Sequence, residues 1–185
     1  SDKIRIDNTP PAASFSENNN STYMKQHDTV VTISDSESGL DGEIFKYYWS
    51  KDSNINNINW NIANQDACTG VNEVQNTIEI SGVTGRYYLH VRSEDKAGNY
   101  GYNTSGAFYL DNQGPDISFS NTGSNNPRGD YNVSLSIADE HVTSLNTTSF
   151  EYQWYKNTIN GNGWRSLSVV NGIGDISALG SGVNN

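Results

Sequence analysis

One segment of the sequence is written twice, and this repeat constrains the fold more than any other feature. IRIDNTPPAASFS occupies residues 4–16, and FYLDNQGPDISFS occupies residues 108–120. Asp7 corresponds to Asp111, which gives an offset of 111 − 7 = 104 residues. A repeat of this length is the size of one small domain, so the sequence predicts tandem copies of a single fold.

The same register continues beyond the opening segment. Ile33 corresponds to Ile137 at an offset of 104, and Trp60 corresponds to Trp164 at the same offset. Between these two pairs, FKYYWSK corresponds to FEYQWYK at an offset of 105, which indicates one extra residue in a loop of the second copy. Chance does not keep one register over so many apolar and aromatic positions.

Apolar residues recur with a period of two, which is typical of half-buried β-strands. In TVVTI, Val31 and Ile33 share one face, and the second copy places Val133, Leu135 and Ile137 on the equivalent face. No segment shows the 3.6-residue stripe of an amphipathic helix. Strands of this kind bury one face against a second sheet, so we expect an all-β protein built from β-sandwiches.

Two further strands follow the same alternation. Phe45, Tyr47 and Trp49 share a face in FKYYW, and Leu89 and Val91 point inward in RYYLHVR. We expect the residues between these inward positions, including His90, to face solvent. His27 and His141 are also expected to be surface side chains.

Composition excludes several classes of partner. Twenty-one acidic residues against eleven basic ones give a formal net charge of −10, so we expect no binding to nucleic acid. No apolar run approaches the length of a membrane span, so we expect no direct membrane insertion. The single cysteine, Cys68, excludes an intrachain disulfide and is interpreted as an inert side chain.

The alignment of the two copies predicts the domain boundaries. Residues 1–8 are interpreted as the last strand and linker of a preceding repeat, residues 9–111 as a first complete repeat, and residues 112–185 as a second repeat. The second repeat lacks a counterpart of IEISGVTGRYYLHVRSEDKAGNYG, so we expect it to lack its last strands. Strand donation by another molecule is one way to complete it.

Several positions resemble the immunoglobulin fold. A tryptophan lies on the third strand of each copy, as Trp49 and Trp154, and Tyr87 lies two residues before Leu89, where that fold usually has its second cysteine. Together with the DN-P opening, the SDSESG loop and the DKAGN turn, the set resembles bacterial immunoglobulin-like repeats of adhesins and other large surface proteins. The resemblance implies tandem immunoglobulin-like β-sandwiches in an extracellular or cell-surface, cell-wall-associated protein.

Acidic loop residues are the main candidates for a functional site. Asp35, Glu37, Asp95 and Asp111 follow strands, and the loops of a sandwich can meet at one end. Calcium prefers carboxylate and carbonyl oxygens, and the YLDNQGP linker distantly resembles that of cadherins. The favoured interpretation is that these residues cap turns through hydrogen bonds to the backbone, so that no cofactor is expected. The alternative is a structural calcium ion, with Asp7, Asp139 and Glu140 as matching residues in other copies.

Other motifs carry weaker hypotheses. Exposed aromatic side chains such as Tyr48, Tyr88, Tyr100 and Tyr102 are suited to stacking on sugars, although cross-strand aromatic pairs explain them as well. The Arg128–Asp130 tripeptide RGD has the sequence of an integrin ligand, and it is also a common combination of turn residues. No nucleophile, phosphate-binding loop or paired-carboxylate cleft is recognisable, so we expect no enzyme activity.

These patterns favour a non-catalytic spacer repeat that projects a functional head, with neighbouring repeats as its partners. The alternative is an adhesive module that binds glycans or a host surface protein. A remote alternative is an accessory domain of a secreted hydrolase.

Overall fold

The computed structural model describes residues 4–41, 44–67, 72–120, 132–141, 150–153, 165–166 and 173–176. The chain forms two compact units, Ser1–Gln113 (unit 1) and Gly114–Asn185 (unit 2), which are described separately. Strands dominate both units, and the only helical element within the described ranges is one short 3-10 helix, so the all-β prediction is confirmed. Cys68, the RGD tripeptide, Trp154 and Trp164 lie outside these ranges.

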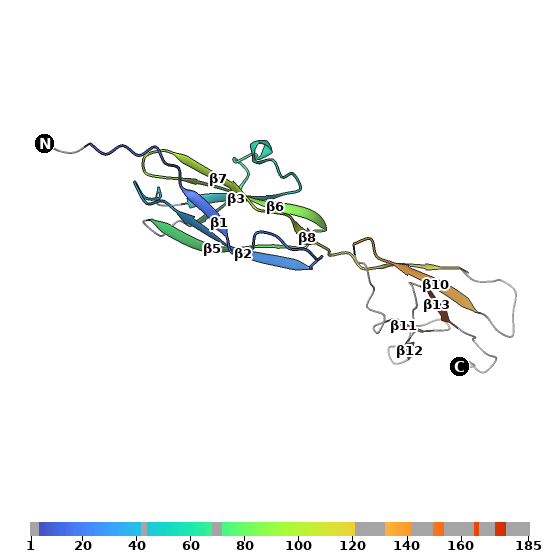
Figure 1. Ribbon diagram of the computed structural model, residues 1–185. Helices are drawn as coiled ribbons and strands as arrows, with labels where there is room; N and C mark the ends of the chain where they lie inside the picture. Colours follow the sequence, from blue (N-terminus) through green and yellow to red (C-terminus); the bar gives the residue numbers. More distant parts are fainter. Residues whose placement is uncertain are drawn as a thin grey trace. The chain divides into compact units, whose positions relative to one another are not determined.

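Unit 1 contains two antiparallel sheets that form two layers (Figure 1). The first sheet has the order β1-β2-β5, from strands β1 (Ala12–Phe15), β2 (Gln26–Ser34) and β5 (Glu73–Ser81). The second has the order β4-β3-β6-β7, from strands β4 (Asn64–Ala67), β3 (Ile44–Ser50), β6 (Gly85–Glu94) and β7 (Tyr100–Thr104). Strand β8 (Phe108–Leu110) pairs with the first three residues of β6.

The core lies between these two sheets, as the alternating pattern predicts. Val31 and Ile33 of β2 and Leu89 and Val91 of β6 are fully buried, and all four belong to one apolar cluster. Trp49 packs against this cluster, and its ring contacts Phe108 edge-on at a centroid distance of 5.4 Å. Apolar packing therefore occupies the positions that the immunoglobulin resemblance would give to a disulfide.

The outer face of the second sheet is covered in part by the segment between β3 and β4. This segment contains the 3-10 helix η1 (Ile55–Asn57), for which Asn54 provides the N-cap. His90 of β6 points to this outer face but is fully buried under the segment, and its Nε2 donates to the Asp52 carbonyl at 2.9 Å. The expectation that this histidine is exposed is therefore wrong.

His27 also differs from the expectation of a surface side chain. It is 6% exposed, and its ring lies 4.5 Å from that of Phe108. A period-two pattern assigns a residue to one face of a sheet, but it does not show which parts of that face another segment covers.

Unit 2 repeats the strand pairing of unit 1. Strands β9 (Asp116–Phe119) and β10 (Val133–Ala138) are antiparallel, as β1 and β2 are. Ala12 pairs with Ser34 in unit 1, and Asp116 pairs with Ala138 in unit 2, so both strands are displaced by 116 − 12 = 138 − 34 = 104 residues.

The other described strands of unit 2 also have counterparts in unit 1. Strand β13 (Ile173–Ile176) pairs with β10 as β5 pairs with β2, and β11 (Glu151–Tyr152) pairs with β12 (Arg165–Ser166) as β3 pairs with β4. Three β10 side chains are buried, as the sequence predicts: Val133, Leu135 and Ile137. Within the described ranges, no helix has the length and apolar character needed to cross a lipid bilayer.

Candidate functional site

The loop that follows β2 is organised by the carboxylate of Asp35. This side chain is 5% exposed, and its Oδ1 accepts hydrogen bonds from the backbone N–H of Glu37 at 3.1 Å and of Gly39 at 2.7 Å. Gly39 has a φ of 80°, a left-handed conformation that favours glycine. The sequence SDSESG thus forms an Asx turn closed by glycine.

The turn between β6 and β7 is organised in the same way by Asp95. This side chain is 1% exposed, and its Oδ1 accepts from the backbone N–H of Ala97 and of Asn99, each at 2.8 Å. Its Oδ2 accepts from Asn99 Nδ2 at 2.8 Å. Gly98 completes the turn with a φ of 87°.

Asp7 joins the two loops from the segment that precedes β1. Its Oδ2 accepts from the Ser38 backbone N–H at 2.9 Å, its Oδ1 accepts from the Thr9 N–H at 2.8 Å, and its carbonyl accepts from Asn99 Nδ2 at 3.3 Å. Donors from Ser38 and from the Thr9 backbone hold the pKa of Asp7 below its ordinary value.

One carboxylate oxygen from each of Asp7, Asp35 and Asp95 lies within 4.8 Å of the other two. We call this the carboxylate end of unit 1. It borders a groove of about 580 Å³, whose lining includes the cationic residues Arg5 and Lys96. Two of the three carboxylates are buried, so their charges are compensated mainly by backbone N–H groups.

The structure brings together only part of the set that the sequence predicts. Asp35 and Asp95 meet, and Glu37 is exposed next to them, where its Oε1 accepts from Thr9 Oγ1 at 3.3 Å. Asp111 lies at the other end of β6, because it follows Leu110, which pairs with Gly85 at the start of that strand.

The third carboxylate of the cluster is Asp7, which the alignment of the two copies assigns to the last strand and linker of a preceding repeat. The DN-P motif marks this position, but it does not specify which unit its side chains contact, because Asn112 of the second copy of the motif bonds to the unit that precedes it.

The donor atoms of the carboxylate end are all oxygens, which fits a hard cation such as calcium. Three carboxylates and nearby backbone carbonyls would hold such an ion, and the ion would neutralise the two buried charges.

Asparagine side chains make several hydrogen bonds at the opposite end of unit 1, where Asp111 Oδ1 also accepts from the Gln113 backbone N–H at 2.9 Å. Asn112 Nδ2 donates to the Lys25 carbonyl at 2.9 Å and to the Val83 carbonyl at 2.7 Å, and the Asn112 N–H donates to Thr84 Oγ1 at 2.9 Å. Asn20 pairs with the backbone of Tyr109, accepting from its N–H and donating to its carbonyl. We call this the amide end.

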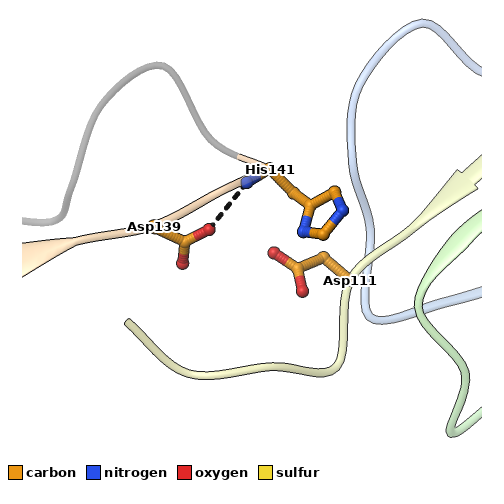
Figure 2. Close-up of side chains that lie close together, drawn as sticks. All are labelled: Asp111, Asp139 and His141. Carbon is orange, nitrogen blue, oxygen red and sulfur yellow. Dashed lines mark hydrogen bonds between the residues drawn. The ribbon is translucent and has the colours of Figure 1, made fainter. Parts of the chain in front are cut away.

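Unit 2 repeats the Asx turn of Asp35. Asp139 Oδ1 accepts from the His141 backbone N–H at 3.0 Å (Figure 2). The corresponding bond in unit 1 joins Asp35 to Glu37, and 139 − 35 = 141 − 37 = 104. The turn is therefore a property of the repeat.

No protein-family model matches the chain, and no curated protein matches it either.

Proposed function

We propose that this chain is a non-catalytic spacer from a bacterial cell-surface or secreted multidomain protein, whose repeats project a functional head. The observation that carries the proposal is the repetition of strand register, because β9 and β10 pair as β1 and β2 do at a fixed offset of 104 residues. Tandem copies of one sandwich extend a chain in proportion to their number.

The strand orders also support an immunoglobulin-like repeat. Sheets β1-β2-β5 and β4-β3-β6-β7 resemble the two sheets of such a sandwich, with β4 paired to β3 and not to β5. Trp49 lies on the third strand, and Tyr87 lies two residues before the buried Leu89.

The two ends of unit 1 support a spacer role as well. Asp7 and Thr9 fix the incoming segment to Ser38 and Glu37 of the loop after β2, and Asn112 fixes the outgoing segment to the turn before β6. Segments held by such bonds rotate less freely than an open linker, which suits a stalk.

Surface display tests this proposal. The chain is placed between a membrane anchor and a reporter epitope on a bacterial cell, and binding of a bulky antibody to the epitope is measured. A spacer raises antibody access relative to a direct fusion, whichever side chains lie on the outer faces of the sheets. Access equal to that of the direct fusion would contradict the proposal.

An adhesive module is the second candidate function. The observation that favours it is a pair of exposed tyrosines, Tyr100 and Tyr102, beside two cationic side chains on the outer face of the second sheet of unit 1.

A further inference from the structure

Three side chains lie in a row across the outer face of the second sheet in unit 1. Lys46 of β3 pairs with Arg92 of β6, and Arg92 pairs with Tyr102 of β7. The neighbouring residues Phe45 and Val91 are buried in the core, so this row faces away from it. Trp60, from the segment between η1 and β4, lies beside the row, since its ring centroid is 5.9 Å from that of Tyr102.

The guanidinium of Arg92 is held by aromatic rings. It lies 5.5 Å from the ring centroid of Trp60 and 5.1 Å from that of Tyr100. Within the described ranges, this guanidinium donates no hydrogen bond and forms no ion pair. Its ring contacts fix its position, and its five N–H donors are available to an acceptor.

The row carries positive charge, whereas the chain as a whole carries negative charge. Two cations stand directly opposite each other on adjacent strands, an arrangement that destabilises a sheet. The Lys46 ammonium donates to the Trp60 carbonyl at 3.1 Å, which leaves donors unused. The chain as a whole has a net charge of −10. In the described part of the chain neither cation forms an ion pair, and such a pair is complementary to a small anion.

Glu94 is the acidic residue that flanks the row on β6. It pairs with Tyr100 across β6 and β7, and a hydrogen bond to its carboxylate raises the pKa of the Tyr100 hydroxyl. The carboxylate is therefore directed to Tyr100.

The tyrosines give the row an accessible apolar surface. Tyr100 is 44% exposed and Tyr102 is 51% exposed, with ring centroids 6.4 Å apart. Sugar rings offer aliphatic C–H groups to an aromatic face and oxygen atoms at their edge. A carboxylated sugar combines this apolar face with an acceptor that matches the planar fork of an arginine.

We propose that Lys46, Trp60, Arg92, Tyr100 and Tyr102, which we call the cation–aromatic patch, bind a saccharide that carries a carboxylate. Arg92 binds the carboxylate through paired N–H groups, Lys46 adds a second charge, and the tyrosines contact the sugar ring. A long polyanion such as nucleic acid is repelled by the net charge of the chain, whereas a short acidic saccharide requires only this local match. The inference goes beyond the spacer role and does not depend on it.

Titration calorimetry and NMR on the 185-residue chain test the proposal. The probes are a digalacturonate, its methyl ester, sialyllactose and lactose. We expect both carboxylated probes, or one of them, to bind, and the indole N–H signal of Trp60 to shift. The methyl ester and lactose are expected to bind at least about tenfold more weakly, because each lacks the charge that Arg92 recognises. A preference for digalacturonate or for sialyllactose identifies the sugar class.

Arg92→Lys keeps the positive charge and removes the planar guanidinium with its paired N–H donors. We therefore expect the affinity for the carboxylated probe to fall by about tenfold or more. Tyr102→Ala, at an exposed edge position, provides a second variant that does not depend on the packing of Arg92. Arg86→Ala is the matched control, since Arg86 lies on the same strand face over a single ring, that of Tyr88, at 5.6 Å. We expect its affinity to equal that of the unchanged chain.

Four results would overturn the proposal. They are equal binding of the methyl ester, unchanged affinity in both Arg92→Lys and Tyr102→Ala, an equal loss in Arg86→Ala, and equal or tighter binding of a poly-glutamate peptide. The last result would identify an acidic-peptide surface instead. None of them alters antibody access in the display experiment, so the spacer proposal is tested independently.

Discussion

The two ends of unit 1 each hold a chain segment that enters or leaves the sandwich, but they use different side chains. At both ends the segment is held by hydrogen bonds to the backbone. The carboxylate end uses Asp7, Asp35 and Asp95, which only accept, whereas the amide end uses Asn20 and Asn112, which donate as well. Asparagine side chains do not titrate, so the hydrogen bonds of Asn20 and Asn112 should depend less on pH and cations than those at the first end.

The largest effect is expected from Asp95→Ala. The substitution leaves the N–H groups of Ala97 and Asn99 without their acceptor in a buried turn, so we expect a loss of about 2–4 kcal/mol in the free energy of unfolding. Urea unfolding followed by tryptophan fluorescence measures it. Asp95→Asn keeps an acceptor oxygen and removes the charge, so its loss should be smaller. An equal loss in both variants would show that charge, and not hydrogen bonding, maintains the turn.

A calorimetric melt with calcium and with a chelator tests the cation hypothesis for the carboxylate end. If the three carboxylates hold calcium, an ion concentration 100 times the dissociation constant stabilises unit 1 by about 2.7 kcal/mol. Asp95→Asn should abolish the shift, and Asn112→Ala should retain it. The absence of a shift in the unchanged chain would mean that these carboxylates act only through their turns.

Asn112→Ala should have a moderate effect. It removes two donations to the carbonyls of Lys25 and Val83, so we expect a loss of about 1–2 kcal/mol that does not change with calcium. The same urea experiment measures it, and Asn19→Ala, at an exposed asparagine, is the control. A loss no greater than that of the control would show that the amide end does not contribute to stability.

The smallest effect is a local response to pH. The folded pKa of Asp7 is lowered, so the stabilisation is present above the unfolded pKa and is lost as the pH falls through the folded pKa. We expect the amide protons of Thr9 and Ser38 to lose protection from hydrogen exchange in this acidic range, while that of Asn112 keeps it. Equal loss at both ends would indicate global unfolding and would remove the contrast between them.

The core could be predicted from the sequence because its signal is local. The alternation of Val31 with Ile33 and of Leu89 with Val91 assigns each residue to a face, and sheets of this kind bury one face. The Asx turns of Asp35 and Asp95 were also foreseeable, because aspartate near glycine caps turns.

The contacts that sequence reading missed depend on which segment covers which face. His90 alternates correctly to the outer face, yet the segment that contains Asp52 buries it. Burial also lowers the pKa of His90, which keeps its ring neutral so that Nδ1 accepts from Thr104 Oγ1. The contact of Arg92 with the Trp60 ring depends on the same segment, whose path no local pattern specifies.

Gly101 limits where this protein can be divided. A Cβ atom at this position would lie 2.0 Å from the carbonyl oxygen of Pro11, so β7 accepts the incoming segment only because it carries a glycine there. Pro11 is buried, and Asp7 is hydrogen-bonded to the same unit. A fragment that keeps these contacts therefore runs from Asp7 to Asn112. A fragment cut at its first strand would lose the segment that anchors it.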